Sequence, residues 1–132
     1  MFRDAGRDEA LLAAMADPFR AWLEPCLVDG RYFGFIAERD GAPVGGIGLM
    51  ELDWPPHPLH PDQDRRGYVL NVYVEPAHRG QGIAKALMKA GETEFEKRGI
   101  DFLVLHATDA GRPLYEAMDW ASPDSEMVKR LT

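Results

Sequence analysis

A short glycine-rich run in the second half of the chain has residue types that suit an anionic ligand. Arg79-Gly80-Gln81-Gly82 places two residues without side chains next to an arginine. Glycines leave backbone N–H groups accessible, and a helix that starts here would add unpaired N–H groups and the positive end of its dipole. Arg79 is able to donate a charge-assisted hydrogen bond to a phosphate oxygen. The run therefore predicts a pyrophosphate site, although a plain tight turn also explains a lone Gly-x-Gly.

The residues on either side of this run predict the strand and the helix that such a site requires. Tyr68 to Val74 is β-branched and aromatic apart from Asn71, as in a strand buried on both faces, and Pro76 ends it. From Ile83 onward apolar residues recur at helical spacing, and Gly99 suits a left-handed cap. The residues after Gly82 match neither a Gly-Lys-Ser/Thr phosphate loop nor the third glycine of a dinucleotide fingerprint.

The remaining segments predict further strands and helices around this unit. Residues 31–39 and 43–52 are expected to form a hairpin around Asp40-Gly41, a favoured turn pair. Gly45, Gly46 and Gly48 suggest close approach of another backbone or a ligand. Four further segments are expected: helix over residues 1–28 divided at Pro18 with Asp17 as its cap, a parallel strand over 100–107, a short helix over 113–118 and a last strand over 126–131.

Residues 53–66 contain four prolines and no periodicity, and they predict a loop. His57 and His60 in this loop are a weak metal pair because no third ligand is placed near them in the sequence. We therefore expect no metal site. The loop is either plain surface or a lining of an acceptor site.

Two motifs in order resemble the GNAT acetyltransferase superfamily. Arg79-Gly80-Gln81-Gly82-Ile83-Ala84 is similar to its acyl-CoA signature, and Leu105 to Glu116 resembles the strand, loop and Leu-Tyr-Glu helix that follow. Glu126-Met127-Val128 resembles the final strand, so the likeness covers about residues 31–130. The resemblance implies one α/β (α+β) domain over residues 1–132, with a mixed, mostly antiparallel sheet and helices on both faces. The usual first strand is missing, because no β-rich stretch precedes Asp8.

The resemblance also implies the reaction, the transfer of an acetyl group from acetyl-CoA to a primary amine. A small molecule, an amino acid or a protein could supply this amine. Backbone groups of Val72 and Val74 would hold the pantetheine arm, and Thr108 stands where the family often has a pantetheine-binding asparagine. The expected pyrophosphate contacts come from the glycine-rich corner: Arg79, Gly80, Gln81, Gly82, Ile83, Ala84 and Lys85.

Tyr115 in the Leu-Tyr-Glu motif matches the family tyrosine near the CoA sulfur, so the resemblance implies a general acid. It would also contact the cofactor; the other interpretation is an aromatic anchor for its helix. The general base stays open among Glu51, Asp53, Glu75 and His106, of which His106 and Glu75 are preferred. Asn71 either touches the acceptor or bridges the sheet.

Charge and composition bear on the expected partners, location and assembly of the protein. The net charge of -7 disfavours nucleic acid and anionic membranes as partners. The single cysteine, Cys26, reads as a buried apolar residue and favours a reducing, cytoplasmic location, and no secretory signal or membrane span is expected. The rival function is a regulatory module that binds acyl-CoA without turnover. An open, apolar edge over Tyr32 to Ala37 further predicts a homodimer through this edge or the N-terminal helices.

Overall fold

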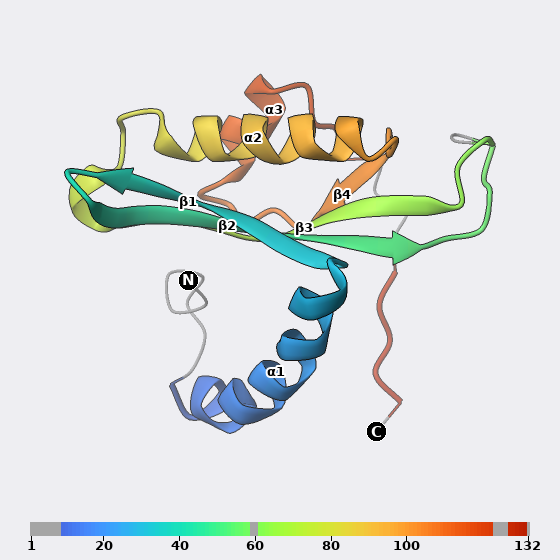
Figure 1. Cartoon of the computed structure of the whole chain (residues 1–132), viewed down its shortest axis with the longest axis horizontal. Coiled ribbons are helices and arrows are strands. Elements are labelled where there is room, and N and C mark those ends of the chain that lie inside the picture. Colours follow the sequence, from blue (N-terminus) through green and yellow to red (C-terminus); the bar gives the residue numbers. More distant parts are fainter. Residues whose placement is uncertain (1–8, 59–60, 123–126, 132) are drawn as a thin grey trace.

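The computed structural model describes residues 9–58, 61–122 and 127–131, and it consists of one sheet with helices on both faces (Figure 1). α2 and α3 cover one face, while α1 lies on the other. In chain order, the elements are α1 (Glu9–Asp29), β1 (Tyr32–Arg39), β2 (Ala42–Asp53), β3 (Arg65–Val74), η2 (Pro76–His78), α2 (Ile83–Lys97), β4 (Leu103–Leu105) and α3 (Arg112–Ala117).

The sheet has the order β1-β2-β3-β4 and is mixed, which confirms the predicted fold class. β1 and β3 both run antiparallel to β2, whereas β3 and β4 are parallel. The predicted hairpin turn is present, with positive φ at both Asp40 (54°) and Gly41 (79°), as a two-residue turn of the favoured kind requires. Within the described ranges no strand pairs with the outer edge of β1, and residues 1–8, where the sequence predicts no strand, lie outside these ranges.

The core lies between the sheet and α2. It contains one phenylalanine of α2, Phe95, which is fully buried and packs edge-on against Phe33 of β1 at 5.3 Å between ring centroids. The buried members of the cluster are Ile47, Leu49, Val69, Leu87, Met88, Phe95 and Ile100. The sequence predicted that β3 is buried on both faces. In the structure Val69 and Val74 are buried, but Tyr68, Asn71 and Tyr73 are only half-buried, because only the face of β3 toward α2 belongs to the core.

The pairing between β3 and β4 is short and leaves a gap in the sheet. Only Gly67 to Val69 pair with Leu103 to Leu105, and β3 continues to Val74 after β4 has ended at Leu105. The predicted strand over residues 100–107 is therefore too long. Its first residue, Ile100, is instead the buried end of the α2 cap, where its N–H donates to the carbonyl of Phe95 at 2.9 Å.

The α3 helix ends with the same cap, but without a glycine. Asp119 adopts a left-handed φ of 69°, and the N–H of Trp120 donates to the carbonyl of Tyr115 at 3.0 Å. Asp119-Trp120 stands where the family usually has Gly-Phe. The aspartate accepts a backbone conformation that costs other residues more, so the helix stops at the predicted place.

Two predictions near the chain ends are wrong, the division of the first helix and the last strand. The helix predicted over residues 1–28 is present as α1, but it runs through Pro18 without a division or an Asp17 cap, and both Pro18 and Pro25 lie at exposed positions. Residues 127–131 form no strand, and Met127 is 94% exposed. Residues 1–8 and Glu126 lie outside the described residues. No described helix is long and apolar enough to cross a membrane.

An ion cluster that the sequence did not predict connects the strands to α2. Glu51 of β2 accepts hydrogen bonds from Arg65 of β3 and from Arg98, the latter at 2.6 Å. Arg98 also donates to the carbonyl of Gly30 at 3.0 Å and stacks on the ring of Phe33 at 3.7 Å. Cys26 of α1 is 3% exposed, which confirms its assignment as a buried residue.

Candidate active site

The glycine-rich corner joins η2 to the start of α2 and is open to solvent. Gly80 and Gly82 have φ values of 79° and 80°, a region that glycine enters without strain. A Cβ atom at either position would meet no atom within 4 Å. The first hydrogen bond of α2 runs from the N–H of Ala86 to the carbonyl of Gly82 at 3.1 Å, and no side chain caps this end. The N–H groups of Ile83, Ala84 and Lys85 therefore have no partner within the helix.

Two arginines hold this corner, of which only one was predicted. Arg79 Nε donates to the carbonyl of Val74 at 2.9 Å, so the arginine ties the corner to the end of β3. Arg39, at the end of β1, donates to the side-chain oxygen of Gln81. Sequence analysis missed Arg39 because the contact spans two elements distant in the chain. Both guanidinium groups bring positive charge to a helix start that already favours anions.

The edge of β3 that faces the gap carries the groups predicted to hold the pantetheine arm. The N–H of Glu75 donates to the carbonyl of Val44 in β2 at 2.8 Å. Because strand residues alternate in direction, the backbone N–H groups of Val72 and Val74 point the opposite way, toward the gap. The pairing with β2 skips Leu70, because Gly48 lies opposite Asn71 and Leu49 opposite Val69. This extra residue of β3 changes which residues point toward β4 and the gap, from Gly67 and Val69 before it to Val72 and Val74 after it.

Tyr115 lies in α3, on the far side of the gap, and is half-buried. Its ring packs against the backbone of Gly111 and beside Trp120, with ring centroids 6.4 Å apart. Burial raises the pKa of the Tyr115 phenol above its ordinary value of 10.0. A phenol in this environment stays protonated over the neutral range, as a proton donor must.

Thr108 begins the turn that leads into α3. Its hydroxyl oxygen accepts the N–H of Gly111 at 3.1 Å, and its carbonyl accepts the N–H of Arg112 at 3.0 Å. The threonine thus orders the start of the tyrosine-bearing helix. This structural use gives Thr108 a role beside the predicted pantetheine contact.

The candidate bases differ in their surroundings. His106 is exposed after β4, and its Nδ1 shares a hydrogen bond with the hydroxyl of Tyr68. Glu75 is exposed after β3, and its carboxylate accepts the hydroxyl of Tyr73 at 3.4 Å. Glu51 is bound by two arginines, Arg65 and Arg98, which occupy its two carboxylate oxygens.

Asn71 lies on the face of the sheet opposite α2, together with three tyrosines. Its side-chain N–H donates to the hydroxyl of Tyr32 at 3.5 Å, so the asparagine bridges β3 and β1. A Cβ at Gly48 would overlap the Tyr32 hydroxyl, whereas one at Gly45 would lie 2.8 Å from the carbonyl oxygen of Tyr73. The close approach predicted for these glycines is therefore made by another backbone at Gly45 and by a side chain at Gly48. The register places Tyr68 and Tyr73 on the same side, and we call Tyr32, Tyr68, Asn71 and Tyr73 the tyrosine face.

No three potential metal ligands of the His, Cys, Asp and Glu types gather anywhere in the described part of the chain. His57 belongs to that part, in the loop between β2 and β3. The prediction for His60 falls outside the described residues.

Solved structures share this fold. A GCN5-related N-acetyltransferase from Ralstonia eutropha JMP134 is 61% identical, with a TM-score of 0.94 over 99% of this chain and 85% of that chain. A predicted acetyltransferase from Clostridium acetobutylicum, solved with acetyl-CoA, is 25% identical, with a TM-score of 0.91 over 98% of this chain and 82% of that chain.

Two proteins with similar sequences are acetyltransferases as well. The mycothiol acetyltransferase of Thermomonospora curvata is 31% identical over 113 residues, which are 83% of this chain and 32% of that protein. The chain thus spans about a third of the length of the curated relatives that it matches. The model of the acetyltransferase (GNAT) family matches residues 2–120. Because this match covers most of the chain, including the corner, the gap and α3, the chain belongs to the GNAT acetyltransferase family.

Proposed function

We propose that this chain is an N-acetyltransferase that moves an acetyl group from acetyl-CoA to a primary amine. One observation carries the proposal: the open edge of β3 leads directly to the uncapped start of α2. An extended arm that ends in a pyrophosphate matches this arrangement, since strand-like backbone groups are followed by N–H groups that favour anions. Acetyl-CoA has this shape and charge.

The cofactor contacts follow from the same geometry. The pyrophosphate binds the N–H groups of the corner from Gly80 to Lys85, with Arg79 and Arg39 contributing charge. The pantetheine arm lies along β3 as an additional strand, accepting and donating through Val72 and Val74. An N–H of β3 near Val72 or Tyr73 then polarises the thioester carbonyl.

The transfer itself needs two proton movements. The neutral amine nitrogen attacks the thioester carbonyl carbon, the new C–N bond forms and the C–S bond breaks. Tyr115 donates its proton to the leaving thiolate of CoA. A base on the other side accepts the amine proton, and either His106, supported by Tyr68, or Glu75, supported by Tyr73, fills this role. Both pairs adjoin the tyrosine face, so the amine approaches from that face.

The test combines binding and turnover. Calorimetry measures the affinity for acetyl-CoA, and a thiol-release assay then screens primary amines: small amines, free amino acids and peptides with free N-termini. We expect acetyl-CoA to bind and at least one amine class to release CoA, with the acetylated product identified by mass spectrometry. Binding without thiol release from any class would support the rival, a regulatory acyl-CoA-binding module. Failure to bind acetyl-CoA would contradict both.

A further inference from the structure

The outer edge of β1 has a defined set of outward-facing backbone groups. The N–H of Glu51 donates to the carbonyl of Arg31 at 2.8 Å, and the register continues from Tyr32 opposite Met50 to Ala37 opposite Gly45. By strand alternation, Phe33 and Phe35 bond to β2 while Tyr32, Gly34 and Ile36 turn their N–H and C=O groups outward. Across the described residues no strand meets these groups.

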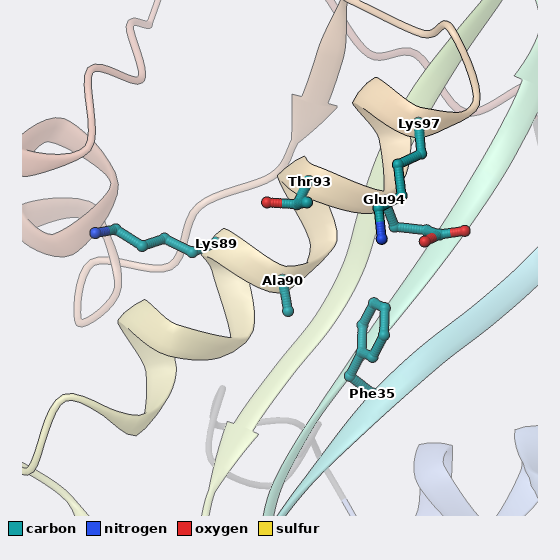
Figure 2. A pocket seen from close by; sticks show the side chains of 6 residues that line it. All are labelled: Phe35, Lys89, Ala90, Thr93, Glu94 and Lys97. Atoms are coloured by element: carbon teal, nitrogen blue, oxygen red, sulfur yellow. The ribbon is translucent and has the colours of Figure 1, made fainter.

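A groove runs beside this edge, under α2 (Figure 2). Its volume is about 300 Å³, and its floor is the ring of Phe35, which faces Ala90. Its lining residues are Phe35, Lys89, Ala90, Thr93, Glu94 and Lys97. On the opposite face of the same strand, Ile36 is 70% exposed. A strand added to β1 would therefore place one set of side chains in the groove and the other set beside Ile36.

We propose that this edge pairs with β1 of a second copy, antiparallel and centred on Gly34, so that two sheets become one. In this register each outward-facing residue meets another: Gly34 lies opposite Gly34 of the second copy, and Tyr32 lies opposite its Ile36. Every outward N–H and C=O between Tyr32 and Ile36 is then paired. A register shifted along the strand places Tyr32 or Ile36 beyond the regular segment, which ends at a bulge between Ala37 and Glu38.

The side chains of this register are complementary as well. On the tyrosine-face side, Tyr32 meets Ile36 of the second copy, an aromatic and β-branched pair of the kind that stabilises antiparallel sheets. On the α2 side, Phe35 meets Phe33 of the second copy in a close, non-hydrogen-bonded pair beside the groove, while each Phe33 ring keeps its packing on Phe95 of its own copy. Trp22 of α1 packs on Tyr32 with ring centroids 5.9 Å apart and is 40% exposed, so it extends the apolar surface that pairing covers.

The first experiment measures oligomeric state by sedimentation velocity of the protein without ligand, from micromolar concentrations upward. We expect a dimer that Ile36→Lys converts to a monomer. Ala117→Lys, at an exposed position on α3, is the matched control and should remain dimeric. Each copy carries a net charge of -7, so an added lysine reduces repulsion between copies. Dissociation by Ile36→Lys therefore cannot come from overall charge. A wild-type monomer throughout this range would overturn the proposal.

The second experiment tests the register by amide hydrogen exchange. The amides of Tyr32, Gly34 and Ile36 should exchange slowly in the wild type and fast in Ile36→Lys, whereas those of Phe33 and Phe35 stay protected in both. A dimer with fast exchange at the three outward amides would overturn the proposal by placing the interface elsewhere. Protection of these amides in a monomer would also overturn it, because another segment of the same chain would then cover the edge.

Discussion

The outer edge of β1 and the upper part of β3 both lack a partner strand in the described part of the molecule, and they differ in what surrounds them (Figure 1). The outer edge of β1 is open along its length, while the inner edge of β3 opens only beyond Val69, where β4 has ended. Both present the same N–H and C=O groups. An open edge therefore does not by itself specify which ligand binds there. The neighbouring side chains and helix ends determine the ligand.

The neighbours are chemically opposite. The β3 edge ends at two left-handed glycines and the uncapped start of α2, with Arg79 bound to its last residue, so an extended molecule with an anionic end fits it. The β1 edge is flanked by Phe35 and Ile36 and lies beside the flank of α2 rather than its end. An apolar strand fits there. Changes at one edge should therefore leave the function of the other intact.

The largest effect is expected from a substitution of Tyr115 in α3. Tyr115→Phe removes the proposed proton donor without changing the ring that packs on Gly111 and Trp120. General acid catalysis contributes about 10²–10⁴-fold, so kcat should fall by about that factor. The affinity for acetyl-CoA and the sedimentation coefficient should not change. Steady-state kinetics and calorimetry measure the two quantities, and an unchanged kcat with chemistry rate-limiting would exclude Tyr115 as the acid.

A carboxylate in the glycine-rich corner should weaken acetyl-CoA binding without affecting the β1 edge. Gly82→Asp places negative charge at the pyrophosphate position, and the loss of charge-assisted hydrogen bonds of about 3 kcal/mol corresponds to about 100-fold weaker acetyl-CoA binding. Gly99→Asp is the matched control, because Gly99 has a similar φ of 76° and equally open surroundings at the other end of α2. The control should bind acetyl-CoA normally. Equal loss of affinity in both variants would mean that backbone strain, not the site, is responsible.

The ion cluster of Glu51, Arg65 and Arg98 should stabilise the folded sheet and its contact with the end of α2. Glu51→Gln leaves Arg65 and Arg98 without their charged acceptor, and we expect the free energy of unfolding to fall by about 1.5–3 kcal/mol in a denaturant titration. Glu94→Gln removes the more exposed partner of Arg98 and should cost under about 1 kcal/mol. Similar losses of unfolding free energy from both substitutions would show that the Glu51 cluster stabilises the fold no more than an exposed ion pair does.

The smallest effect concerns pH. Because burial raises the pKa of Tyr115 above 10.0, its phenol stays protonated as the pH rises through the neutral range. Loss of activity through Tyr115 should therefore begin only above about pH 10. A pH profile of kcat that compares wild type with Tyr115→Phe isolates this limb. An alkaline fall below pH 9 that disappears in Tyr115→Phe would contradict the assignment.

Local signals in the sequence predicted much of the fold. The Asp40-Gly41 hairpin, the helix from Ile83 and the left-handed Gly99 are all confirmed, because each depends on residues close together in the chain. The glycine corner was found for the same reason. The division of α1 at Pro18 and the last strand were predicted from equally local signals and are wrong, because a local pattern does not show which tertiary contacts a segment makes.

The sequence by itself determined the hairpin, the glycine-rich corner with the helix that follows it, and the resemblance that led to the family. Only the tertiary structure decided which edges remain open, that Arg39 reaches Gln81, that Glu51 is bound by two arginines and that the tyrosines share one face. The physical reason is that these features join residues far apart in the chain. Such contacts depend on strand register and on where β4 ends, which no local pattern of residues encodes.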